Sequence, residues 1–143
     1  MSNLVLVDLD GTLADGTHRL HHIQKAPRDW DSFYDECGGD SPHEDVIGVV
    51  NSINEQYTTI ILTGRVERTR AVTEEWLSEN EVGYHALIMR PEGCRTDDHI
   101  WKIEVARMFG LHNIAFVIED RNRVVEAFRK VGVRVMHIAD GNF

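Results

Sequence analysis

Cysteine and long hydrophobic runs are both scarce in this chain. Its two thiols, Cys37 and Cys94, form no CxxC pair and have no metal-ligand spacing, so we expect reduced cysteines rather than a disulfide framework. Apolar runs such as 60–62 and 114–118 are strand-sized and far below the roughly 20 residues of a membrane span. No basic segment precedes an apolar stretch at the N-terminus. We therefore expect no membrane association and a cytoplasmic location.

Basic charge is also in short supply. The chain has 15 Lys+Arg against 24 Asp+Glu, a formal net charge of -9. Such a surface repels polyphosphates at distances beyond the Debye length of roughly 8 Å, which argues against tight, non-specific binding of long nucleic acid. An acidic balance does suit a site that gathers carboxylates around a divalent cation.

The remaining composition is that of an ordinary globular protein, with 42% hydrophobic and 27% charged residues. A length of 143 residues is near the commonest size of one compact domain and too short for two independent cores. We therefore predict a single domain over residues 1–143.

Strand-like and helical patterns alternate along the chain. Short apolar runs predict strands at 4–9, 57–62, 86–89, 114–118 and 133–138, and helical patterns follow at 67–79, 99–109 and 122–131. A further helix is expected up to residue 53, with Ser41 as N-cap, Pro42 at its first position, and 46, 49, 50 and 53 facing the core. This order predicts an α/β fold: a parallel sheet with right-handed crossovers and helices on both faces.

Residues 15–40 interrupt the pattern and predict an irregular insert with one short helix near 30–36. Its histidines, 18, 21 and 22, suggest metal ligands, but no partner has a metal-site spacing, and a solvated surface is the favoured interpretation. Its aromatic residues, 30, 33 and 34, either stack on a base or form the small core of the insert, and the second is the commoner role.

Polar residues follow the predicted strands at their carboxyl ends, where parallel sheets bind ligands. These segments are Asp8-Leu9-Asp10-Gly11-Thr12, Thr63-Gly64-Arg65 and Glu119-Asp120-Arg121, and Lys102 lies in the helix after the third strand. Carboxylates gathered in this way raise one another's pKa unless positive charge intervenes. A hard oxygen cluster with no histidine at ligand spacing favours Mg²⁺ as that charge.

These segments, in this order, resemble the four motifs of the haloacid dehalogenase (HAD) superfamily of phosphatases, and the resemblance spans nearly the whole chain. It implies a Rossmannoid parallel sheet, a flap or small cap formed by the insert after the first strand, and no large cap domain. It also implies a Mg²⁺-dependent phosphomonoester hydrolase that works through an aspartyl-phosphate intermediate.

The resemblance assigns roles residue by residue. Asp8 would attack phosphorus, and Asp10 would protonate the leaving oxygen and later activate water. Thr63 would hydrogen-bond a phosphoryl oxygen and Lys102 would neutralise charge, while Mg²⁺ would be held by Asp8, Asp120 and the backbone carbonyl of Asp10. Residues two apart in a strand face the same way, so two carboxylates can flank one phosphoryl group. Their environments would have to keep Asp8 ionised and Asp10 protonated.

The segments 95–98, 119–126, 132–133 and 141–143 further resemble the 3'-phosphatase domain of bacteriophage polynucleotide kinase/phosphatases. This resemblance implies that Arg19, Arg65 with Gly64, and Asp98 support the phosphate, with Asp97 as the alternative to Asp98. It implies a nucleotide or nucleic-acid 3'-phosphate as substrate, a role in DNA or RNA repair, and the host cytoplasm if the chain is phage-encoded.

Two departures leave alternatives open. No GxxxxGK[ST] phosphate loop occurs, so the kinase half of such an enzyme is missing and a separate kinase partner is possible. The insert is acidic rather than basic, which leaves room for a 5'-nucleotidase or another small-molecule phosphatase. The alternative from another class is a phosphatase-fold subunit or binding module of a repair complex.

Overall fold

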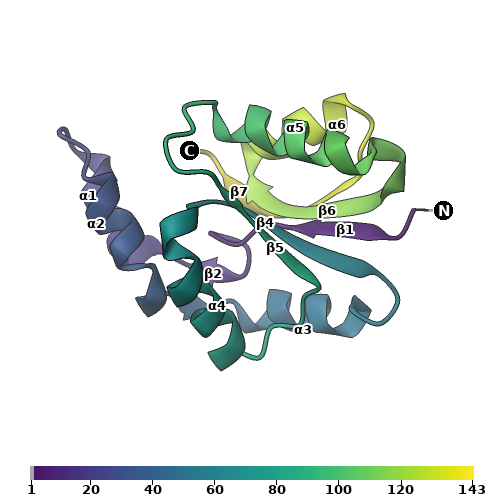
Figure 1. The fold of residues 1–143 in the computed structure, drawn as a ribbon, viewed down its shortest axis with the longest axis horizontal. Helices are drawn as coiled ribbons and strands as arrows, with labels where there is room; N and C mark the ends of the chain where they lie inside the picture. Colours follow the sequence, from purple (N-terminus) through teal and green to yellow (C-terminus); the bar gives the residue numbers. More distant parts are fainter. Residues whose placement is uncertain (1) are drawn as a thin grey trace.

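A five-stranded parallel sheet forms the centre of the molecule in the computed structural model, which describes residues 2–143 (Figure 1). The strand order is β5-β4-β1-β6-β7, and all four pairings are parallel. The strands are β1 (Leu4–Val7), β4 (Thr58–Val66), β5 (Ala86–Arg90), β6 (Ile114–Arg121) and β7 (Val135–Gly141). The predicted α/β class is confirmed.

Four helices cover the two faces of the sheet. They are α3 (Glu44–Ile53), α4 (Arg70–Glu79), α5 (Asp98–Phe109) and α6 (Asn122–Lys130). Helices α3 and α4 lie below the sheet in Figure 1, and α5 and α6 lie above it. Alternate residues of β1 enter the two cores: Val5 and Val7 pack with Trp76 of α4, and Leu6 packs with Phe128 of α6. Burial on both faces explains why β1 is a continuous apolar run.

The insert after β1 is closed at its base by a short antiparallel pair, β2 (Ala14–Asp15) and β3 (Ser41–Pro42). Between these strands lie α1 (His21–Gln24), α2 (Trp30–Asp35) and one-turn 3₁₀ helices at Thr17–Arg19 and Cys37–Gly39. Figure 1 shows α1 and α2 projecting beyond the carboxyl ends of the sheet. The expected small insert is confirmed, and residues 2–143 contain no large cap domain.

The predicted start of α3 is wrong. Ser41 and Pro42 pair with β2 as β3, and the helix begins at Glu44 with His43 in the N-cap position and no side-chain cap. The sheet pairing that closes the insert overrides the local capping signal. The predicted core face is confirmed at Val50, which is buried, and at Val46 and Ile53, which pack against the core; Val49 is 49% exposed, and Ile47 is buried instead.

Strand ends near the predicted site are longer and less regular than the sequence suggests. The β4–β5 pairing shifts register between Thr63 and Val66, and the β6–β7 pairing shifts between Glu119 and Arg121. The polar motif residues therefore lie on irregular extensions of the strands, where the hydrophobic pattern has already ended. Further 3₁₀ turns lie at Glu67–Thr69 and Leu111–Asn113. None of the helices within residues 2–143 is long and apolar enough to cross a membrane.

Candidate active site

A tight turn after β1 gathers the first motif. The Leu9 carbonyl accepts the backbone N–H groups of Thr12, Leu13 and Ala14 at 3.2, 2.9 and 3.0 Å. Gly11 has φ 83°, and a Cβ on it would lie 2.0 Å from Oδ2 of Asp120. Only glycine fits both constraints, so Gly11 allows the turn and the Asp120 carboxylate to approach one another.

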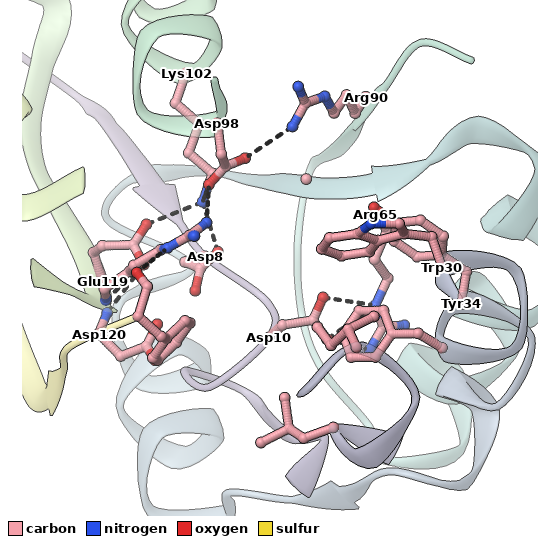
Figure 2. A pocket seen from close by; sticks show the side chains of 16 residues that line it. Asp8, Asp10, Trp30, Tyr34, Arg65, Arg90, Asp98, Lys102, Glu119 and Asp120 are labelled. Atoms are coloured by element: carbon pink, nitrogen blue, oxygen red, sulfur yellow. Dashed lines mark hydrogen bonds and ion pairs between the residues drawn. The ribbon is translucent and has the colours of Figure 1, made fainter. Parts of the chain in front are cut away.

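Asp8 is buried at the centre of this arrangement (Figure 2). The ammonium of Lys102 lies 2.7 Å from its Oδ1, and the Thr12 hydroxyl donates to its Oδ2 at 3.0 Å. The same hydroxyl lies 3.2 Å from Oδ1 of Asp120. Thr12, which the sequence did not single out, therefore links the predicted nucleophile to a predicted metal ligand.

Glu119 holds the side chain of Lys102, a predicted site residue, in place. Its Oε2 is 3.0 Å from the Lys102 ammonium, and its Oε1 accepts the backbone N–H groups of Asp120 and Arg121, both at 3.1 Å. Both carboxylate oxygens of Glu119 are thus used in shaping the loop and orienting the lysine. The carboxylates of Asp8 and Asp120 are left facing each other.

The single ammonium group of Lys102 faces three carboxylates in this cluster. Burial, reinforced by Glu119, raises the pKa of Asp8 to about 7 despite Lys102, and burial with the neighbouring Asp8 raises the pKa of Asp120 to about 7. Oxygens of Asp8, Glu119 and Asp120 all lie within 4.8 Å of one another. Closely packed oxygens that resist ionisation fit a hard divalent cation such as Mg²⁺. The predicted contribution of Asp10 is its backbone carbonyl, and its side chain lies outside this cluster.

Two arginines hold the side chain of Asp10 instead. Nη2 of Arg19 and Nη2 of Arg65 lie 2.6 and 2.8 Å from its Oδ1. The buried Asp40 carboxylate holds the same two groups at 2.8 and 2.9 Å. His18 adds a fifth member, with its Nε2 2.7 Å from Asp40. This network joins the insert to the ends of β1 and β4, and it brings both predicted arginines to Asp10. Both arginines are fully buried, and Arg65 lines the cavity described below whereas Arg19 does not.

The electrostatics of Asp10 are opposite to the expectation from sequence. Burial alone would raise the pKa of Asp10, but the guanidinium groups of Arg65 and Arg19 outweigh it and hold the pKa below its usual value. The pKa values of the two aspartates are indeed pushed apart, but in the opposite sense: the pKa of Asp10 is lowered, and that of Asp8 is raised to about 7. The cause is the buried arginine pair, whose contact with Asp10 no local pattern shows.

A cavity of about 180 Å³ opens above these groups. The predicted Gly64, Arg65, Asp98 and Lys102 line it together with Asp8, Asp10 and Asp120. The insert supplies a wall that includes Trp30 and Tyr34, whose rings stack at 28° with centroids 5.9 Å apart. Figure 2 shows these two rings across the cavity from Lys102 and Glu119.

The geometry favours Asp98 over Asp97. Oδ2 of Asp98 lies 3.8 Å from the Lys102 ammonium and 3.4 Å from Arg121. A Cβ on Gly64 would lie 2.6 Å from Oδ1 of Asp98, so glycine permits this approach. Asp97 occupies the N-cap position of α5 and does not line the cavity.

Thr63 is less directly placed. It is buried beside the cavity, and its hydroxyl oxygen accepts the backbone N–H of Arg65 at 3.1 Å. Its contact with a phosphoryl oxygen stays a prediction.

Sequence reasoning missed several participants. Thr12 and Glu119 were inside the quoted motifs and could have been found there, because both flank a predicted carboxylate. Asp40 gave no such signal, since it lies at the far end of an irregular insert. Arg121 was also inside a quoted motif, whereas Arg90, which lines the cavity with it, could be found only once the strand ends meet.

The fold and the clustered carboxylates place the chain among HAD-type phosphatases. Solved structures of this class are similar to our structure over nearly the whole length of this chain. An HAD-like hydrolase from Streptococcus pneumoniae matches at 13% identity and a TM-score of 0.64, covering 98% of this chain and 86% of that one. An HAD enzyme from Bacteroides thetaiotaomicron, in complex with magnesium and inorganic phosphate, matches at 13% identity and a TM-score of 0.54. The match covers 100% of this chain and 97% of that one. At such identities the likeness concerns the fold.

Within that class, the chain belongs to the family of polynucleotide kinase PNKP phosphatase domains, which matches residues 2–143. A chain in the structure of the Pnkp1/Rnl/Hen1 complex matches with 26% identity and a TM-score of 0.81, covering 99% of this chain. Our chain spans about half of that chain, 48% of its length. A search of curated proteins finds no significant match.

Proposed function

We propose that this chain is a Mg²⁺-dependent phosphomonoesterase that acts through an aspartyl-phosphate on nucleotide or nucleic-acid 3'-phosphates. The observation that carries the proposal is the placement of Asp8, whose buried carboxylate opens onto the cavity between Lys102 and Asp120. The proposal treats residues 1–143 as one catalytic domain and the insert at 15–40 as its flap.

In the first step, a carboxylate oxygen of Asp8 attacks phosphorus and the bond to the leaving oxygen breaks. Lys102 and the Thr12 hydroxyl keep the carboxylate in position. Lys102 and Thr63 stabilise charge on the phosphoryl oxygens. The leaving oxygen takes its proton from Asp10.

Asp10 can take up that proton only when its arginine contacts weaken. Arg19 and Arg65 stabilise its carboxylate in the free protein. A phosphoryl group that accepts hydrogen bonds from the same guanidinium groups would draw them away and raise the pKa of Asp10. In the second step Asp10 removes a proton from water as the water attacks phosphorus, and Asp8 is released.

Asp8 and Asp120, with the backbone carbonyl of Asp10, would hold the Mg²⁺ ion. When bound, the ion supplies positive charge that keeps both carboxylates ionised and offsets the charge of the phosphoryl group. The raised pKa values of Asp8 and Asp120 support this requirement.

Two features support a 3'-phosphate of a nucleotide or nucleic acid. The matched family is named for the polynucleotide kinase phosphatase domain, and a similar chain occurs in the Pnkp1/Rnl/Hen1 RNA repair complex. The aromatic wall, with Trp30 43% exposed, offers a flat surface to a terminal base or sugar. Residues 1–143 contain no GxxxxGK[ST] phosphate loop, and a kinase is the partner that we propose for them.

The cavity itself also favours a rival substrate. A volume of about 180 Å³ is below the usual range of ligand pockets, about 300–1,000 Å³, and the insert is acidic. Both properties suit a small phosphate ester as well as a single nucleotide end. A 5'-nucleotidase is therefore the second candidate.

The test compares phosphate release from an oligonucleotide 3'-phosphate, a nucleoside 3'-monophosphate, a nucleoside 5'-monophosphate and a hexose phosphate. We expect the highest kcat/KM on one of the two 3'-phosphates. Preference for the 5'-monophosphate would transfer the proposal to the nucleotidase. Preference for the hexose phosphate would mean that the family likeness reflects shared ancestry and not a shared substrate.

A further inference from the structure

The insert contains a second group of metal-ligand side chains, outside the carboxylate cluster. A ring nitrogen of His21, a ring nitrogen of His22 and a carboxylate oxygen of Glu36 all lie within 4.8 Å of one another. The two histidines open α1, and Glu36 follows the last residue of α2. The histidines suggest metal ligands already in the sequence, but Glu36 approaches them only when α1 and α2 fold against each other.

His22 presents a buried nitrogen to this group. Its Nε2 lies 2.9 Å from Oε2 of Glu36, yet it forms no hydrogen bond of acceptable geometry with any of residues 2–143. A buried ring nitrogen normally has a partner, and one without a partner needs an explanation. A bound metal ion would supply that partner.

His21 is oriented as metal-binding histidines usually are. Its Nδ1 lies 3.0 Å from the backbone carbonyl of His18. A carbonyl can only accept, so Nδ1 carries the proton and Nε2 keeps its lone pair for a ligand. Metal ligands commonly anchor their second ring nitrogen in this way. The two imidazole rings are tilted by 40°, with centroids 4.0 Å apart.

We infer that His21, His22 and Glu36 bind a transition-metal ion of the Zn²⁺ type, with water completing the coordination. Two imidazoles and one carboxylate suit Zn²⁺, whereas Mg²⁺ prefers oxygen ligands alone. The contact between His22 and Glu36 is already short enough for a shared ion. His21 and Glu36 are exposed at the surface, so small rotations of their side chains can bring all three ligand atoms to one ion.

This site would act on the shape of the active-site cavity. Helix α1 carries Ile23 and α2 carries Tyr34, and both residues line the cavity. An ion bound between α1 and the end of α2 would fasten these two helices together. The inference goes beyond the proposed function and does not depend on it.

The test measures uptake of Zn²⁺ and Co²⁺ by the full chain without an affinity tag, in saturating Mg²⁺. Dialysis followed by metal analysis gives the stoichiometry, and the visible spectrum of bound Co²⁺ reports its ligands. We expect one equivalent in the unmodified protein and at least a tenfold weaker affinity in His22→Gln and Glu36→Gln. His112→Gln and Glu55→Gln are the matched controls, since both change exposed residues elsewhere on the surface.

Two further measurements make the outcome decisive. Asp120→Asn should retain the equivalent of Zn²⁺, because this variant alters only the oxygen cluster. Zn²⁺ should raise the Tm of the unmodified protein and of both controls, but not that of Glu36→Gln. Equal uptake by His22→Gln and the unmodified protein would overturn the inference, and so would loss of the ion in Asp120→Asn.

Discussion

Asp8 is the residue on which the proposed chemistry depends most directly. Asp8→Asn removes the nucleophilic oxygen while preserving shape, and Lys102 retains Glu119 as a charged partner. We expect turnover to fall by at least about 10³-fold, with stability changed by about 1 kcal/mol or less. Phosphate release and thermal unfolding, measured on the same preparation, test both parts. Turnover near that of the unmodified protein would contradict the mechanism.

The pKa values of Asp8 and Asp120 predict how Mg²⁺ binding varies with pH. Both are raised to about 7 in the folded protein, above the ordinary aspartate value. The metal-free fold therefore binds protons more tightly than the unfolded chain, and these groups lose their stabilising effect as pH rises from about 4 through 7. Mg²⁺ needs the ionised carboxylates, so its affinity should increase over the upper part of that window.

We therefore expect Mg²⁺ to raise the Tm more at pH 8 than at pH 6, while in chelator the Tm should decline as pH rises through 7. Scanning calorimetry with and without Mg²⁺ measures both trends. Asp120→Asn is the control, because it removes one titrating group and should flatten both curves. A Mg²⁺ effect independent of pH would be incompatible with this site.

Asp40 tests the arginine network. It is buried and contacts both Arg19 and Arg65, which in turn hold Asp10. Asp40→Asn leaves two buried guanidinium groups with one fewer charged partner, and we expect a loss of about 3 kcal/mol in the free energy of unfolding. Denaturant unfolding measures it. Asp45→Asn, at an exposed position on α3, should be nearly neutral.

Individual residues were predictable from the sequence where they stand in a motif at a strand end. Asp8, Arg65, Lys102 and Asp120 all meet at the cavity because parallel strands end at one edge. Asp40 could not be found in this way. The direction of the Asp10 pKa shift could not be predicted either. Asp40 and Arg19 both belong to the insert, whose sequence has no periodic pattern.

At the scale of elements, the insert decides how the cavity is walled. Arg68, just after β4, fastens α2 to the rest of the molecule: its guanidinium group lies 2.6 Å from Asp35 and 3.0 Å from Asp31, and 5.9 Å from the Tyr34 ring. Exposed pairs of this kind are individually weak, because water and salt screen the charges. Together they hold the aromatic residues of α2 over the cavity.

Trp30→Ala tests whether that wall contacts the substrate. Stacking on a base contributes about 1–3 kcal/mol, so we expect kcat/KM on an oligonucleotide 3'-phosphate to fall by roughly 5- to 150-fold. Turnover of a small generic phosphate ester should hardly change. Trp30→Phe keeps an aromatic ring and should restore most of the loss. Equal losses on both substrates would show that Trp30 only holds the insert together.

Elements were predictable where burial sets a repeating pattern. β1 reads as a continuous apolar run because helices cover both of its faces, and α5 ends at Gly110 with φ 84° as expected of a glycine stop. The Ser41 cap failed because pairing between β2 and β3 outweighs a local signal. Helix α1 has four residues, too few for any periodicity, and its form depends on contact with α2.

At the scale of the whole molecule, the net charge of -9 limits how much nucleic acid can be held. We expect contact with one or two phosphates, so log kcat/KM against log salt should have a slope of roughly -0.7 to -1.4 on an oligonucleotide. Steady-state kinetics at several salt concentrations measures the slope. A much steeper dependence would reveal an extended binding surface. The nucleoside 3'-monophosphate, which has no neighbouring phosphates, provides the reference slope.

The central position of β1 affects how the molecule is made. β1 leaves the ribosome first among the sheet strands, but its partners β4 and β6 follow only around residues 58 and 114. Until then an apolar strand has no neighbour, and a growing chain in that state is open to chaperones and to aggregation. Asp8 likewise meets Asp120 only once β6 has been translated. The proposed active site is therefore completed only when β6 joins β1 in the sheet.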